Sequence, residues 1–185
     1  MSKLACEQGN DSEIVKRKVK IMKKGITRRE REVTDINEII GILDRAKTAH
    51  IGMVDNGKPY VVPMNYGYTM IDGKLTLYFH GATVGRKLDI LKVSPDVFVE
   101  IDTDIMPFEG NSACQYGVCY SSIMCEGKAT VIEDVDGKID GLKKLMKTQT
   151  GKDFEFNDKM VAGVTVIRID VDEFTAKKRP MPSRG

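Results

Sequence analysis

The fold is decided by residues 49–80, which read AHIGMVDNGKPYVVPMNYGYTMIDGKLTLYFH. Short apolar runs are separated here by two turn sequences, Asp55-Asn56-Gly57-Lys58 and Asp72-Gly73-Lys74. Asn-Gly and Asp-Gly pairs tolerate the positive φ angles that tight hairpin turns require. The segment therefore predicts a meander of three antiparallel strands, over residues 49–54, 60–68 and 75–80.

The remainder of the chain adds further strands and a few helices. Helical spacing of apolar residues predicts helices over 35–47 and 86–91 and around 139–146, and apolar runs or alternation predict strands over 96–102, 118–132 and 161–171. Residues 104–117 lack periodicity and are expected to form a long loop, of the kind that often serves a ligand or partner. Strands without regular strand–helix alternation indicate a mainly β fold, a closed antiparallel barrel with peripheral helices.

Two residues predict irregularities in this barrel. Gly127 interrupts the strand over 118–132, where a bulge would bend it. Pro63 has no N–H to donate to a sheet, so it implies a sheet edge, a bulge or a strand end with free backbone groups. Such an opening would suit a flat heterocycle, and a kink needed for barrel closure explains it equally well.

The composition predicts one compact domain over residues 31–185, preceded by a basic N-terminal arm over residues 1–30. The 185 residues include 29 Lys and Arg and 27 Asp and Glu, a formal charge of +2. This near balance argues against a general polyanion-binding surface, so a nucleic-acid partner is not expected. Because no apolar run approaches the ~18–20 residues of a membrane span, and no apolar leader is found, we expect a cytoplasmic protein.

Cysteine and histidine are too few, and wrongly spaced, for a structural metal site. Cys6, Cys114, Cys119 and Cys125 form no CxxC pair, and the chain has two histidines. We therefore expect free thiols and no metal, with Cys125 as a small core residue and Cys114 in a loop.

A candidate anion site follows the third predicted strand, in the stretch YFHGATVGRK over residues 78–87. Small residues there let a ligand approach the backbone, and Arg86 and Lys87 stand at the start of a helix whose free N–H groups also favour an anion. A solvated pair of surface cations is the simpler interpretation. Ser121 and Ser122, at the entry to a later strand, could also bond phosphate oxygens, although such pairs are common without a function.

No catalytic side chain can be assigned. His50 and His80 lie near strand ends, where a histidine is more often a hydrogen-bonded structural residue than a base. Nothing in the sequence places a Ser or Cys nucleophile beside either, and hydrolase motifs are absent.

Taken in order, several segments resemble the pyridoxamine phosphate oxidase-like split-barrel flavoproteins, nearest their nitroimidazole-resistance branch. They are AHIGMV (49–54), GKPYVVPMNY (57–66), LYFHGA (77–82), GRK (85–87), SSIMCEGKA (121–129) and VIRID (166–170). The resemblance covers about residues 30–179. It implies a homodimer of split β-barrels that binds FMN, with FAD as an alternative, in a groove between the subunits.

The same resemblance assigns binding roles to the clusters above. Four residues would lie along the isoalloxazine ring with their backbone groups: Val62, Pro63, Met64 and Asn65. The ribityl chain would be flanked by Tyr78, Phe79, His80 and Gly81. The phosphate would be held by Arg86 and Lys87, with Ser121 and Ser122 completing that end of the site.

The function implied is that of an FMN-dependent oxidoreductase. It would pass electrons or hydride, from a donor such as a reduced nicotinamide, to a small oxidised acceptor such as a nitroimidazole. Arg86 stands where nitroimidazole-resistance members are expected to carry His, and Arg cannot act as an acid or base near neutral pH. A second hypothesis is a flavin, haem or deazaflavin carrier without turnover. A bound cofactor that nicotinamide cannot reduce would favour it.

Overall fold

The computed structural model describes residues 26–182, so most of the predicted basic arm, residues 1–25, lies outside the described residues. Within the described part, Ile26 is buried. No helix between residues 26 and 182 is both long and apolar enough to cross a membrane.

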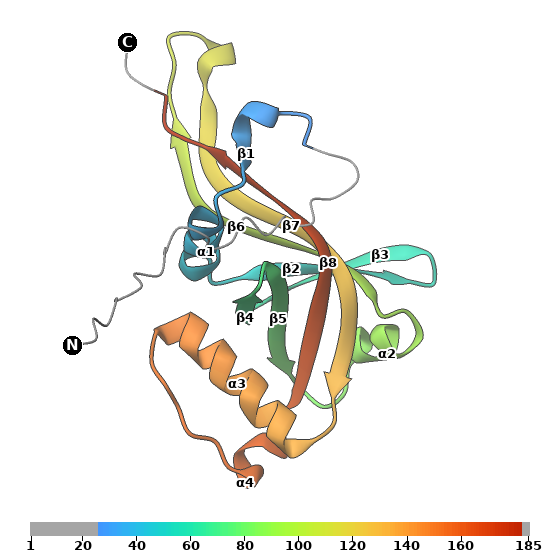
Figure 1. The fold of residues 1–185 in the computed structure, drawn as a ribbon. Coiled ribbons are helices and arrows are strands. Elements are labelled where there is room, and N and C mark those ends of the chain that lie inside the picture. Colours follow the sequence, from blue (N-terminus) through green and yellow to red (C-terminus); the bar gives the residue numbers. More distant parts are fainter. Residues whose placement is uncertain (1–25, 183–185) are drawn as a thin grey trace, which may run out of the picture.

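The described chain folds into one antiparallel sheet with a few helices around it (Figure 1). In chain order the elements are η1 (Arg29–Arg31), β1 (Glu32–Val33), α1 (Ile36–Arg45), β2 (Ala49–Asp55), β3 (Lys58–Met64), β4 (Tyr66–Ile71), β5 (Lys74–Gly81), α2 (Arg86–Val93), β6 (Asp96–Phe108), η2 (Ala113–Gln115), β7 (Gly117–Ile132), α3 (Val135–Thr150), α4 (Asp158–Val161) and β8 (Thr165–Arg179). The mainly β class predicted from the sequence is confirmed.

The sheet has the strand order β3-β2-β6-β7-β8-β5-β4, with β1 added beside β8. The prediction of a closed barrel is wrong, because β3 and β4 lie at opposite ends of this order and do not pair. The two strands diverge at Asn65, which is the only residue between them. The predicted single strand over 60–68 is therefore two strands. Pro63 lies on β3, an edge strand of the sheet, as one of its interpretations required.

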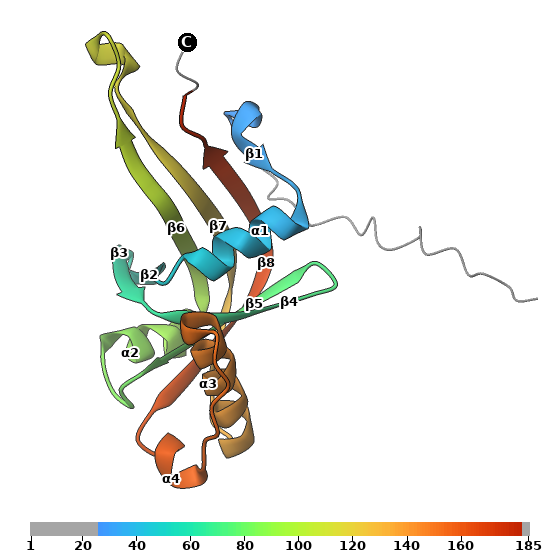
Figure 2. The same ribbon diagram turned by 90° about the vertical axis from the view of Figure 1, so that its left-hand side faces the viewer.

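The predicted loop over 104–117 is largely a hairpin. β6 continues to Phe108 and β7 begins at Gly117, and the two project from the sheet as a long arm (Figures 1 and 2). The sequence shows no alternation of apolar and polar residues here because the strand is irregular. Asp104 has a φ of 59°, and the register of pairing shifts between Thr103 and Met106. A one-residue shift moves the following side chains to the other face, so the sequence period is lost at that point.

The last strand also differs from its prediction of 161–171. β8 begins at Thr165 and runs to Arg179, and Val161 belongs to α4. The irregularity predicted at Gly127 is confirmed, since the pairing with β8 shifts between Glu126 and Gly127, although the extra residue, Asp172, lies on β8 rather than on the predicted strand. A Cβ at Gly127 would lie 2.3 Å from the Asp170 carbonyl oxygen, so only glycine fits this bend.

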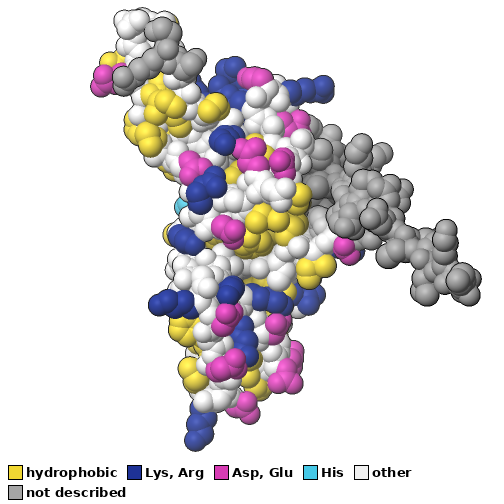
Figure 3. Space-filling view, turned by 60° about the vertical axis from the view of Figure 1, so that its left-hand side comes forward, with side chains coloured by type: hydrophobic (Ala, Val, Ile, Leu, Met, Phe, Trp, Pro, Cys, Tyr) yellow, Lys and Arg dark blue, Asp and Glu magenta, His cyan; other side chains and the backbone are white. Residues whose placement is uncertain are grey.

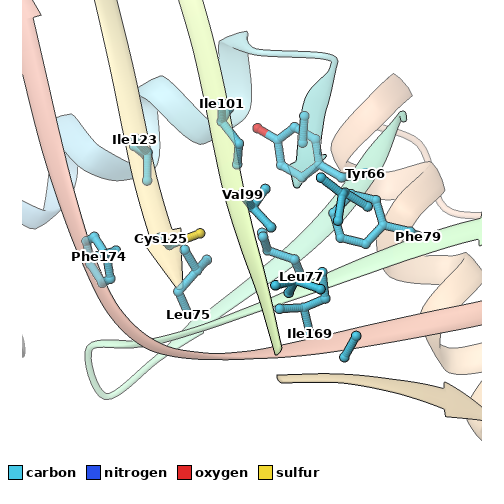
Figure 4. Close-up of a cluster of buried hydrophobic side chains, with 14 of the residues drawn as sticks. Tyr66, Leu75, Leu77, Phe79, Val99, Ile101, Ile123, Cys125, Ile169 and Phe174 are labelled. Carbon is cyan, nitrogen blue, oxygen red and sulfur yellow. The ribbon is translucent and has the colours of Figure 1, made fainter. Parts of the chain in front are cut away.

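The core lies between the inner face of the sheet and α1 (Figure 4). From α1, Ile39, Ile42 and Leu43 are fully buried against the strands. Asp35 caps this helix by accepting a hydrogen bond from the Asn37 N–H. Cys125 is a buried core thiol, as predicted, whereas Cys114, predicted in a loop, is exposed on η2.

The buried thiol of Cys125 and the buried phenol of Tyr66 are weak acids, and we expect them to make the protein less stable at alkaline pH. Burial raises the pKa of Cys125 from 9.0 to about 12, and burial also raises the pKa of Tyr66 well above its usual 10.0, while the Tyr66 hydroxyl donates to the Leu43 carbonyl at 2.7 Å. The unfolded chain therefore loses these protons first. The contribution of these two groups to the free energy of unfolding is fully present below about pH 9. Above that pH it falls, by up to about 1.4 kcal/mol per pH unit for each group.

Urea denaturation at a series of alkaline pH values checks this expectation. Cys125→Ala, compared with its own stability at neutral pH, is expected to show a shallower decline between about pH 9 and 10 than the unmodified chain. Identical slopes for the two proteins would contradict it.

Candidate functional site

The start of α2 forms an open cradle for an anion. Gly85 has a φ of 140° and carries no side chain to cap the helix. Its carbonyl already accepts from the N–H groups of Leu88 and Asp89. The preceding N–H groups, those of Arg86 and Lys87, have no acceptor within the helix and carry the positive end of its dipole. The donors at this point fit a phosphate group.

Lys87 places its ammonium group beside this helix start. A Cβ on Gly81, the last residue of β5, would lie 3.0 Å from Lys87 Nζ and 3.9 Å from Met64 Cε at the end of β3. Within the described chain, Lys87 forms no ion pair. The fold thus brings Met64, Gly81 and Lys87 together and leaves the charge of Lys87 without an ion-pair partner among the described residues.

Arg86 is engaged elsewhere. Its guanidinium lies 2.8 Å from a carboxylate oxygen of Asp55, at the end of β2, and 4.3 Å from the centre of the Tyr60 ring. A phosphate at the helix start would have to share Arg86 with Asp55 or draw it away. Lys87 is therefore the better placed of the two predicted phosphate ligands.

The predicted ring-binding residues lie along the free edge of the sheet. Val62 and Met64 turn toward the core, whereas Pro63 lies exposed on the outer face. The amide of Asn65 donates to the Lys47 carbonyl at 3.0 Å. Because β3 pairs with β2 alone, a ring at this edge would meet backbone groups rather than a wall of side chains.

The predicted ribityl-binding residues on β5 have different surroundings. Phe79 is fully buried in the core, and Tyr78 is covered by α3, where the Lys144 ammonium lies 4.6 Å above its ring. His80 is exposed and Gly81 faces Lys87. Gly81 therefore lies beside the anion cradle. The side chains of Tyr78 and Phe79 are instead packed against other residues of the chain.

Ser121 and Ser122 follow each other on β7 and so point to opposite faces. Ser121 lines a cavity of about 300 Å³ together with Lys178 and Arg179. Its buried hydroxyl makes no hydrogen bond with any described residue. An orphaned buried donor suits a ligand oxygen.

Within one chain, these serines are not brought to the anion cradle. They pair with Thr103 and Asp102 of β6, toward the β6–β7 arm, whereas α2 lies away from that arm, below the β2–β3 hairpin in Figure 1. The two parts of the predicted phosphate end therefore do not meet within the described chain.

A further cluster was missed by the sequence reasoning. His50 Nδ1 lies 3.2 Å from an oxygen of Glu100, and one polar atom each from His50, Glu100 and Asp102 lie within 4.8 Å of one another. Burial, followed by the charge of Asp102, raises the pKa of Glu100. The alternation in residues 96–102 put Glu100 and Asp102 on one face, but their pairing with β2 could not be predicted from sequence alone.

The open antiparallel sheet with its peripheral helices can be compared with known families. Residues 35–178 match the family model of pyridoxamine 5'-phosphate oxidase. The chain belongs to this family. Comparison with functionally curated proteins found no match.

Solved structures agree with this assignment. The chain is 32% identical to a candidate 5-nitroimidazole antibiotic resistance protein from Bacteroides thetaiotaomicron, with a TM-score of 0.68, over 80% of this chain and 86% of the other. Flavocytochrome Anf3 from Azotobacter vinelandii (23% identity, TM-score 0.67, 83% and 71% covered) has a similar fold. So has the FAD and heme binding protein from Mycobacterium smegmatis (20% identity, TM-score 0.69, 84% and 77% covered).

Proposed function

We propose that this protein binds FMN and transfers electrons through it to a small oxidised acceptor. One observation carries the proposal: the uncompensated ammonium of Lys87 lies over Gly81 and beside Met64, at an uncapped helix start. These are the ends of the two strands along which the ring and its phosphate tail are expected to lie. The family membership and the flavin named in two structural neighbours support it.

In this proposal the chain's own residues bind and orient the cofactor. Lys87 and the N–H groups at the start of α2 hold the phosphate, and Gly81 leaves room for the adjoining chain of the ligand. The free edge at Val62 to Asn65 offers backbone groups to the ring. Bound flavin supplies the redox chemistry, so no side-chain nucleophile is needed. FAD fits the same cradle through its phosphate.

We infer that two copies of the chain complete the site. Ser121 and Lys87 of one chain lie apart, so a second copy is needed to join them. An exposed apolar strip on the outer face of the sheet supplies a surface for it: Val61 and Phe98, both aligned with Gly52, are 57% and 40% exposed. Further exposed hydrophobic side chains gather on the β6–β7 arm (Figure 3), at Ile105, Met106, Tyr116 and Val118.

A charge placed in this strip is expected to separate the copies. Phe98→Asp should convert the dimer to a monomer, because each of two symmetric copies would bury an unpaired carboxylate. Light scattering coupled to size-exclusion chromatography measures the mass. Ile71→Asp, which changes a residue that is 66% exposed on edge strand β4, is the matched control and should leave the mass unchanged. A monomeric unmodified protein would refute the two-copy site.

The acceptor is proposed to be a nitro compound, as the name of the Bacteroides relative suggests. Arg86, where a His was expected, is tied to Asp55 and is not an acid or base at neutral pH. Any proton needed by the acceptor must then come from another group.

The decisive experiment is the absorption spectrum of the purified protein, with mass analysis of the released chromophore. We expect a yellow protein that releases FMN and is bleached by a reduced nicotinamide, with the colour restored by metronidazole. A colourless protein whose melting temperature is unmoved by FMN would refute the proposal. A yellow protein that no nicotinamide reduces would favour a flavin carrier.

A further inference from the structure

His50 lies at a junction of three strands on the outer face of the sheet. Across the ladder it faces Glu100 of β6 on one side and Pro63 of β3 on the other. Directly opposed residues of antiparallel strands point to the same face. The His50 side chain, which is 43% exposed, therefore stands beside Pro63, on the edge strand along which the flavin ring is proposed to lie.

Glu100 fixes the orientation of the imidazole. Its carboxylate lies 3.2 Å from Nδ1, and no hydrogen bond joins the other ring nitrogen, Nε2, to a described residue. A carboxylate that accepts from Nδ1–H leaves Nε2 free to exchange a proton with a ligand, the arrangement by which many enzymes orient a histidine base. The geometry provides one fixed nitrogen and one available nitrogen.

The surroundings of His50 are acidic on one side and apolar on the other. On this face the groups around it are Pro63 from β3, Glu100 and Asp102 from β6, Met124 and Ser122 from β7 and, beyond Ser122, Lys177 from β8. Glu100 is half-buried, and burial and the charge of Asp102 raise its pKa. His50 thus has two carboxylates on the β6 side and the apolar edge strand on the other.

We propose that His50, oriented by Glu100, is the proton-transfer residue at the flavin ring. This inference rests on the proposed function. Reduction of a nitro group to a nitroso group by a reduced nicotinamide follows R–NO2 + NAD(P)H + H⁺ → R–NO + NAD(P)⁺ + H2O. One N–O bond breaks, the nitrogen gains two electrons, and the leaving oxygen departs as water. His50 donates one of the two protons from Nε2 and regains it from solvent, while Glu100 keeps the ring in place as a positioning residue.

The test compares the pH dependence of bound FMN in the full chain and in three variants. The midpoint potential of the FMN is measured by spectroelectrochemical titration across neutral pH. We expect a change of slope in the unmodified protein that is lost in His50→Gln and displaced along the pH axis in Glu100→Gln. Glu155→Gln, which changes an exposed carboxylate paired with Lys143 in the segment between α3 and α4, is the matched control and should follow the unmodified protein.

Turnover gives a second readout. With metronidazole as acceptor, His50→Gln is expected to lower kcat about 100-fold or more, and to leave the Kd for FMN within about twofold. Equal potentials and equal kcat in His50→Gln and the unmodified protein would overturn the inference while leaving flavin binding intact. A chain that takes up no FMN would overturn the proposed function itself, and the role of His50 with it.

Discussion

Alanine at position 67 is expected to lower the free energy of unfolding by about 2 kcal/mol or more. Gly67 lies on β4 directly beneath α3, and a Cβ there would lie 2.3 Å from Leu145 Cα and 2.4 Å from Leu145 N. Both atoms belong to the backbone of α3, so no side-chain rotation relieves the clash and the helix must move. Overpacking of this kind typically costs about 1–3 kcal/mol, occasionally more.

Movement of α3 would also break hydrogen bonds that cover an edge strand. Gln149 donates to the Tyr66 carbonyl at 2.7 Å, and the Thr148 hydroxyl accepts from the Tyr68 N–H at 3.3 Å. Urea denaturation followed by circular dichroism measures the effect. Gly163→Ala, where a Cβ would meet no atom within 4 Å, is the matched control. Equal stabilities of the two variants would show that α3 is not pressed against β4.

Lys87→Ala is expected to weaken FMN binding about 10- to 100-fold. A charge-assisted hydrogen bond contributes about 1.5–3 kcal/mol, and each 1.4 kcal/mol is a factor of ten in Kd. Arg86→Ala should cost less, because Arg86 shares its charge with Asp55. The double variant should lose the most. Quenching of FMN fluorescence on titration with protein measures the Kd.

Lys92→Ala is the control for this series. Lys92 lies on the same helix, is exposed and pairs with Asp89, so its removal should leave the Kd unchanged. Equal effects at positions 87 and 92 would mean that the cradle at the start of α2 does not hold the phosphate.

The sequence predicted the fold class well where hydrophobic period and turn residues agree. The hairpins at 55–58 and 72–74, the edge position of Pro63 and the bulge at Gly127 each follow from one local property of a residue. The errors occur where pairing between distant strands overrides the local pattern of apolar and turn residues. The divergence of strands at Asn65 and the register shift after Thr103 depend on pairing with distant strands, which no local pattern encodes.

For the candidate site, the sequence identified the residues better than their arrangement. It predicted Gly81 and Lys87 as parts of one site, and the fold brings them together. It could not predict that the Phe79 side chain is buried in the core or that Asp55 forms an ion pair with Arg86, since both depend on contacts between separate elements. For His50 the sequence favoured a hydrogen-bonded structural residue; the structure shows its partner to be Glu100, which lies 50 residues away on β6 and could not be predicted.

The position of β8 has a consequence for how the protein is made. The last strand of the described part, β8, lies in the interior of the sheet, between β7 and β5, and also pairs with β1 near the start of that part. Until residues 165–179 have left the ribosome, β5 and β7 each expose an unpaired edge. The sheet can therefore assemble only after residues 165–179 have been synthesised, and a chain truncated before residue 165 would be prone to aggregate rather than fold.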